Sequence, residues 1–178
     1  MERYPNLFWT PCVAHCIDLM LKDIGKIPFV RNIVESSTSI TQFIYNHAYV
    51  LRLMRRFTNN KELVHLAITR FATSFISLQC LLNSMWDVKT MFLSQHWRAL
   101  SISRNPEGEG MCRQVSYDQS FWARVEEVCA ISEPLVRVLW LVDGGKPAMG
   151  YMYEAMDRAK EAICAYYEDK VDERFEKQ

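Results

Sequence analysis

The chain has 178 residues, of which 49% are hydrophobic and 24% charged, including five Trp, eight Tyr and nine Phe. This composition belongs to a globular domain with a sizeable core and excludes a disordered chain. The net charge is zero, which argues against a dedicated, strongly basic nucleic-acid module. No apolar run approaches the roughly 20 residues of a membrane span, so we expect no membrane partner.

The charge is unevenly distributed along the chain. Residues 1–104 carry 12 Lys or Arg against 6 Asp or Glu, whereas residues 105–178 carry 9 against 15. The basic part could face a polyanion such as DNA, and ordinary variation of surface charge is the alternative. Six cysteines without a regular disulfide spacing, and no apolar signal segment at the start, favour a reducing compartment.

The first predicted elements are a short extended segment over residues 6–9 and a helix over residues 11–24. Pro11 suits the first turn of this helix, and Gly25 is a signal for its end. A spacing of three and four residues predicts one buried apolar face, made of Val13, Ile17, Met20, Leu21 and Ile24. Asp18 and Asp23 then fall on the solvent side, and we expect a solvated face rather than metal-binding carboxylates.

Cys12, His15 and Cys16 stand at i, i+3 and i+4, so one face of this helix carries all three. Two thiolates and an imidazole are candidates for a zinc site, but no second pair with matching spacing supplies the remaining ligands. A Cys/His nucleophilic pair is the other alternative, and no oxyanion-hole motif accompanies it. We expect instead inert thiols buried against neighbouring helices, with His15 donating to a carbonyl.

Two helices follow, one beginning at Pro28 and one over residues 48–57. The Ser36-Ser37-Thr38-Ser39 run inside the first lowers helix propensity and favours a bend. The second carries Arg52, Arg55 and Arg56, and Thr58-Asn59-Asn60 ends it. With Lys61 and Arg70, these arginines are candidates for a stripe that contacts phosphates; an ordinary charged surface is the alternative.

The remaining elements are also helical. A helix starting near Thr69 continues, with a break, through residues 91–92 and 96–98. The breakers and charges of residues 104–117 predict a loop. Asp118 is a good N-cap for a long helix that Pro134 should kink or split, and Gly144-Gly145 ends it. A last helix starts near Pro147, and its charged end over residues 168–177 is expected to fray. The sum is an all-α, irregular assembly of five to seven helices with at most one strand.

The order and spacing of several segments resemble the hAT transposase superfamily, in the version common in plant genomes. The two landmarks are Cys12-x-x-His15 and Thr69-Arg70-Phe71, the second resembling a motif in which Trp is usual at the last position. Further similar segments lie at residues 41–47, 51–55, 133–139, 142–144 and 147–156. The resemblance implies an RNase H-like catalytic domain, with an Asp-Asp-Glu triad that binds divalent metal, interrupted by a helical insertion.

The resemblance also divides the chain and sets its expected function. Residues 1–25 correspond to the end of the RNase H-like first half, and residues 26–178 to the helical insertion, with the loop at about 104–117. No triad residue, DNA-binding zinc finger or family dimerisation region maps onto this chain. We therefore expect a noncatalytic fragment or domesticated remnant without a cofactor, nuclear or otherwise cytoplasmic. A retained module that binds nucleic acid or protein is the alternative, and a small metal-binding or cysteine enzyme is a third.

Overall fold

The computed structural model describes residues 12–63, 70–143 and 150–176, and this part of the chain is all-α, without a strand. The predicted extended segment over residues 6–9 lies outside the described residues. The elements are α1 (Val13–Ile24), α2 (Pro28–Asn46), α3 (Ala48–Phe57), α4 (Arg70–Asn83), α5 (Met85–Leu93), α6 (Gln95–Arg98), the short 3-10 helix η1 (Ser101–Arg104), α7 (Pro106–Tyr117), α8 (Gln119–Asp143) and α9 (Met152–Glu176).

Helices α2 and α3 have the bounds that their sequence signals indicate. Pro28 occupies the first turn of α2, where its missing N–H costs no intrahelical bond. The hydroxyls of Thr38 and Ser39 donate to carbonyls four residues earlier, at 2.7 and 3.0 Å, so the polar run stays within one helix. Helix α3 spans the predicted residues 48–57.

Helix α8 is the centre of the molecule, because α1, α2, α4 and α9 all pack against it. Its fully or almost fully buried side chains include Val128, Leu135 and Leu139, which share one core with Ile17 and Leu21 of α1. Asp118 caps its start by accepting a hydrogen bond from the backbone N–H of Phe121 at 2.9 Å. Pro134 lies inside α8 and does not split it.

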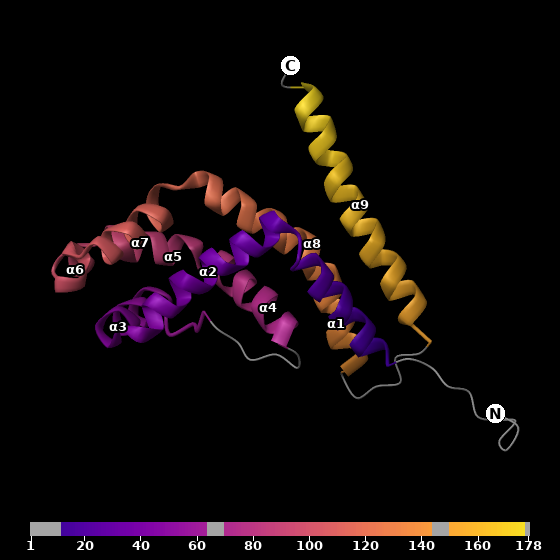
Figure 1. Cartoon of the computed structure of the whole chain (residues 1–178), viewed down its shortest axis with the longest axis horizontal. Coiled ribbons are helices and arrows are strands. Elements are labelled where there is room, and N and C mark those ends of the chain that lie inside the picture. Colours follow the sequence, from indigo (N-terminus) through magenta and orange to yellow (C-terminus); the bar gives the residue numbers. More distant parts are fainter. Residues whose placement is uncertain (1–11, 64–69, 144–149, 177–178) are drawn as a thin grey trace, which may run out of the picture.

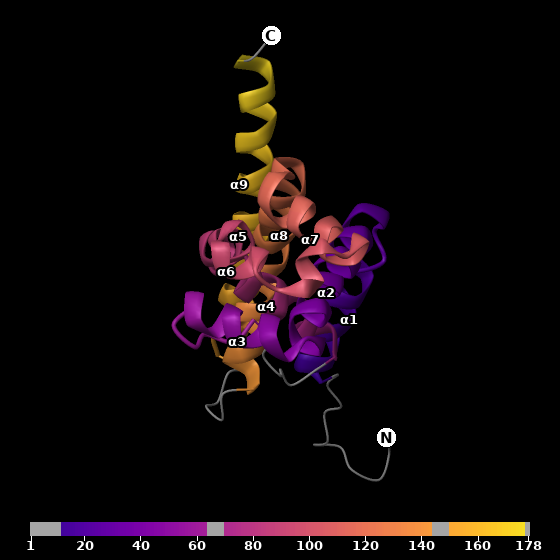
Figure 2. The same cartoon turned by 90° about the vertical axis from the view of Figure 1, so that its left-hand side faces the viewer.

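Helices α3, α5, α6 and α7 gather at one end of the molecule, on the left of Figure 1 and facing the viewer in Figure 2. An aromatic cluster holds this end together: the Trp97 ring lies 4.6 Å from Phe92 and 6.2 Å from Phe43, centroid to centroid. Ser94 caps α6 by accepting from the backbone N–H of Trp97 at 3.1 Å. The predicted break in the helix that runs from Thr69 toward residues 96–98 is confirmed, and the structure interrupts this helix twice, at Ser84 and at Ser94.

The predicted loop over residues 104–117 is wrong, because Pro106–Tyr117 forms helix α7. Pro106 stands in its first turn, where a proline suits a helix, and Glu107 and Glu109 complement the positive end of the helix dipole. Gly108 is buried against the backbone of η1; a Cβ there would lie 2.1 Å from the carbonyl oxygen of Ile102. Pro106 therefore begins this helix, and Gly108 allows it to pack closely against η1, so neither residue breaks the helix.

Helix α9 packs chiefly on α8 and then extends past it, so that its far end stands away from the other helices (Figure 1). Its predicted start near Pro147 falls outside the described residues, and the helix begins at Met152. The helix ends at Glu176, and the expected fraying over residues 168–177 stays a prediction. Across the described ranges, no helix has the length and apolarity needed to cross a membrane.

Candidate nucleic-acid interface

The Cys12-x-x-His15 region lies on an exposed face of the described structure. Cys12 precedes α1 in an extended conformation, and Cys12, His15 and Cys16 are all exposed. The predicted burial of these thiols is therefore wrong, because α1 turns Ile17 and Leu21 toward α8 and leaves the opposite face in solvent. His15 makes no hydrogen bond in the described part of the chain, so its expected bond to a carbonyl is wrong too.

The same exposed face includes Met20, which was predicted to be buried and is 41% exposed. Asp18 is expected on the solvent side of the helix, but one of its carboxylate oxygens is buried and has no hydrogen-bond partner among the described residues. Across the described residues, no group of three or more His, Cys, Asp or Glu side chains could hold a metal ion.

The buried thiol of Cys129 and the half-buried thiol of Cys80 are poor nucleophiles. Burial, followed by the nearby carboxylates of Glu133 and Glu126, raises the pKa of Cys129 to about 12. Burial also raises the pKa of Cys80. Because the thiolate is the reactive form, neither cysteine is prepared for catalysis near neutral pH.

The second landmark lies at the start of α4. Thr69 lies outside the described residues, and Arg70 and Phe71 begin the helix. The side chains of Arg70 and Phe71 also lie outside the described part, so the candidate phosphate contact at Arg70 stays a prediction.

The arginines of α3 divide into two kinds. Arg52 and Arg56 are exposed and make no ion pair with any described residue. The Arg52 guanidinium lies 5.7 Å from the centre of the exposed Tyr49 ring. Lys61, just beyond the helix, is also exposed. Arg55 is different, because its guanidinium is held by the carboxylate of Glu62, with both Nε and Nη2 lying 2.9 Å from Oε1.

Glu62 connects Arg55 to helix α2. Its second carboxylate oxygen accepts from the hydroxyl of Tyr45, whose oxygen in turn accepts from the backbone N–H of Leu63 at 3.1 Å. The chain returns to this point through Asn59 and Asn60, which have φ values of 53° and 61°. Asparagine tolerates this left-handed region better than most residues, so the turn that ends α3 also positions Glu62.

Three further arginines lie at the same end of the molecule: Arg98 on α6, Arg104 on η1 and Arg113 on α7. All three are exposed, and within the described part of the chain none forms an ion pair. The elements that carry them are adjacent, since α6 packs against both α3 and η1, and η1 packs against α7. The ring of His96 on α6 lies 6.4 Å from that of Phe57 on α3, which places the two arginine groups on neighbouring helices. We call Arg52, Arg56, Lys61, Arg98, Arg104 and Arg113 the basic end.

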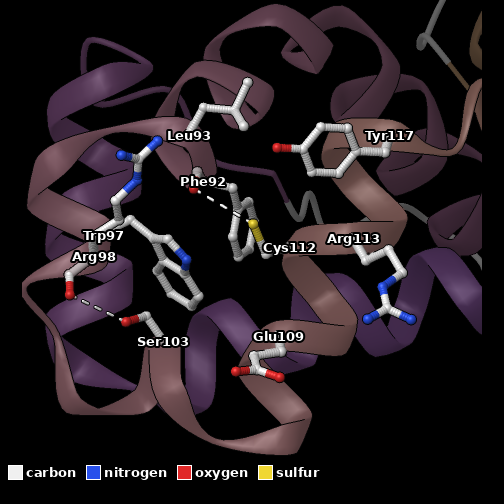
Figure 3. Close-up of a pocket in the computed structure, with 9 residues that line it drawn as sticks. All are labelled: Phe92, Leu93, Trp97, Arg98, Ser103, Glu109, Cys112, Arg113 and Tyr117. Carbon is white, nitrogen blue, oxygen red and sulfur yellow. Dashed lines mark hydrogen bonds between the residues drawn. The ribbon is translucent and has the colours of Figure 1, made fainter.

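A pocket of about 330 Å³ lies within the basic end, between α5, α6, η1 and α7. Figure 3 shows Phe92, Trp97 and Cys112 in its interior, with Arg98 and Arg113 on opposite sides. The Cys112 thiol donates a hydrogen bond to the carbonyl oxygen of Phe92, 3.5 Å away. Glu109 also lines the pocket, so the local charge is mixed rather than purely positive.

Four cations elsewhere on the surface are paired with carboxylates. Arg137 and Arg158 are 77% and 76% exposed, yet each contacts a carboxylate one helical turn earlier, on Glu133 and Glu154. Lys26 and Lys160 pair in the same way with acidic residues three positions earlier. Among the described residues, the side chains of the basic end lack such ion pairs, whereas Arg55 beside them is paired. Arg31 on α2 and Arg124 on α8 are also exposed without an ion pair, so the basic end differs in gathering several such side chains on adjacent elements.

Comparison with known protein families gives a match to part of the chain. The model of the family described as a domain of unknown function, DUF659, matches residues 1–40, which include α1 and most of α2. This family is found in hAT-type transposase-like proteins. No curated protein and no solved structure matches the chain.

Proposed function

We propose that this chain is a noncatalytic, helical part of a hAT-type transposase-like protein, and that its basic end holds nucleic acid by its phosphates. The observation that carries the proposal is the group of exposed arginines without ion pairs on α3, α6, η1 and α7. The DUF659 match over residues 1–40 supports the family, and the resemblance of later segments extends it along the chain.

The physical basis is the cost of bringing a phosphate to a cation that is already engaged. A phosphate approaching Arg137 must compete with the carboxylate of Glu133, whereas one approaching Arg52 or Arg56 displaces only water and counterions. Arg52 and Arg56 are four residues apart and so lie on one face of α3. The exposed ring of Tyr49 beside Arg52 adds an aromatic surface on which a base could stack.

The proposal assigns no catalytic carboxylate to this chain. Asp23, Glu133, Glu154 and Asp157 each hold a basic side chain on or next to their own helix, which is a surface role. Two-metal phosphoryl transfer instead needs carboxylates that converge on ions about 4 Å apart.

Binding of a fluorescent 20-nucleotide strand and of its duplex, measured by anisotropy over a salt series, tests the proposal. We expect the Arg52→Ala/Arg56→Ala variant to bind on the order of tenfold more weakly at 100 mM salt and to lose nearly two units of salt slope, about 0.7–0.9 per phosphate contact. With Mg²⁺ or Mn²⁺ present, the strands should stay intact.

The matched control is Arg137→Ala/Arg158→Ala, which removes the same charge from exposed side chains on α8 and α9. Its affinity should stay within about twofold of the unmodified protein because both guanidiniums are already paired. Equal losses in the two double variants, or no binding even at 50 mM salt, would rule out the basic end as a nucleic-acid surface.

A further inference from the structure

We propose that Glu62 is an internal substitute for a phosphate: its carboxylate masks Arg55 in the free protein and lowers the affinity of the basic end until a nucleic-acid phosphate takes its place. The inference rests on the proposed function, and it identifies how binding at that surface is restrained. It also assigns Arg55 a different role from those of Arg52 and Arg56.

The geometry of the pair supports this exchange. Two guanidinium nitrogens of Arg55 meet the same carboxylate oxygen at 2.9 Å, and a phosphate oxygen can be held by the same donors. The side chains of Arg55 and Glu62 are 44% and 38% exposed, so an incoming phosphate can reach the guanidinium from solvent. An ion pair this exposed contributes little to stability, and a phosphate can therefore compete with it.

Glu62 stays in place while Arg55 is free to turn. Its other carboxylate oxygen is held by the Tyr45 hydroxyl, which also accepts from the backbone N–H of Leu63. The left-handed turn at Asn59 and Asn60 fixes the approach of this segment to α3. Arg55, by contrast, is a long side chain on a helix surface, and Glu62 alone binds its guanidinium among the residues that the structure describes.

Glu62 should affect phosphate binding chiefly through the cations of α3 and the residues just after it. Glu62 is the one acidic residue in the stretch 48–63, which also carries Arg52, Arg56 and Lys61. Neutralising Glu62 should therefore remove the one negative charge of this stretch and release Arg55 as a fourth cation within it.

The test is the affinity of Glu62→Gln for the same labelled strand and duplex. The glutamine amide oxygen can still accept from Tyr45 but no longer carries the charge that holds Arg55. We expect binding to be roughly fivefold tighter at 100 mM salt and the salt slope to increase by nearly one phosphate contact. In the Arg55→Ala/Glu62→Gln variant, the slope should return to that of the unmodified protein.

Glu107→Gln is the matched control, because it removes one exposed carboxylate from α7 at the same end without releasing an arginine. It should change affinity by less than about twofold and leave the slope unaltered. If Glu62→Gln and Glu107→Gln have equal effects, or if Glu62→Gln has none, the masking role is wrong while the proposed function stands. If the unmodified protein does not bind at all, both fail.

A measurement on the unmodified protein keeps the test independent of how well the variant folds. The Nε–H resonance of Arg55 in a heteronuclear NMR spectrum reports the partner of that donor. We expect it to shift when the strand saturates the protein, as Glu62 gives way to phosphate. An unshifted Arg55 resonance alongside shifted Arg52 and Arg56 resonances would overturn the inference.

Discussion

Gly108 is the position at which two backbone segments approach most closely among the described glycines. An added Cβ would lie 2.1 Å from the Ile102 carbonyl oxygen and 3.0 Å from its carbon. The contact joins α7 to η1, and both elements carry arginines of the basic end. A side chain here would force two rigid backbones apart, since no flexible group can move aside.

Replacing Gly108 with Ala should therefore destabilise the protein by about 1–3 kcal/mol, the usual cost of overpacking. The measurement is the free energy of unfolding in urea, followed by circular dichroism. Gly110→Ala is the control two residues later, because a Cβ there meets no atom within 4 Å. Gly110→Ala should stabilise by up to about 1 kcal/mol through helix propensity. Similar changes in the two variants would show that the close contact does not exist.

At the scale of elements, helices with local start and stop signals were predictable. Pro28 begins α2, Gly25 follows α1, and the Thr58-Asn59-Asn60 run ends α3. Helix α7 was not predictable in the same way, because its proline and glycines also occur in loops. What decides between the two is the backbone of η1, against which Gly108 packs. That contact is tertiary and leaves no periodic signal in the sequence.

The candidate site was predictable only in its α3 part. Arginines four residues apart on one helix can be recognised from spacing alone, whereas Arg98, Arg104 and Arg113 lie on three different elements. The pairing of Arg55 with Glu62 also depends on a turn with left-handed backbone at two asparagines. The exposure of Cys12 and Cys16 was missed because an i, i+3, i+4 pattern defines a face without indicating whether a neighbour covers it.

The cap of α8 gives a prediction with a definite pH dependence. The Asp118 carboxylate accepts from the Ser120 hydroxyl at 2.7 Å and from the Phe121 N–H at 2.9 Å, and these bonds lower its pKa. Asp118→Ala should cost about 1 kcal/mol at pH 7. Because the folded pKa lies below the unfolded one, the contribution is complete above the unfolded pKa, near 3.8, and is lost as the pH falls through the lower folded value.

Urea unfolding from pH 7 to pH 2.5 checks this cap. The difference between the unmodified protein and Asp118→Ala should shrink below about pH 4. Asp118→Asn serves as the control, since asparagine caps as well as aspartate without titrating, and its stability should lack this component of the acid dependence. If the difference in unfolding free energy between the unmodified protein and Asp118→Ala does not change with pH, the carboxylate does not cap α8 in its ionised form.

At the scale of the whole molecule, the two ends differ in packing as well as in charge. The basic end is built on the aromatic cluster of Phe43, Phe92 and Trp97, with short elements packed on several neighbours. The other end projects α9, which packs chiefly on α8. Among the described side chains of α9, Ala159 alone is fully buried, and the partly buried core contacts end at Ile163. The basic end is therefore a rigid surface and α9 a weakly supported one.

This difference predicts how amide hydrogens exchange in native buffer. The part of α9 after Ile163 is shorter than the ~15 residues at which even good isolated helices become marginal, so it should open without the rest of the protein. Its amides should exchange within seconds to minutes, whereas those of α8 between Val125 and Leu139 should require global unfolding. Exchange read by mass spectrometry, with peptides from both helices, provides the comparison. If distal α9 is as well protected as α8 and its protection rises with protein concentration, a second copy of the chain covers it. If the same protection does not depend on concentration, the prediction that distal α9 opens locally is wrong.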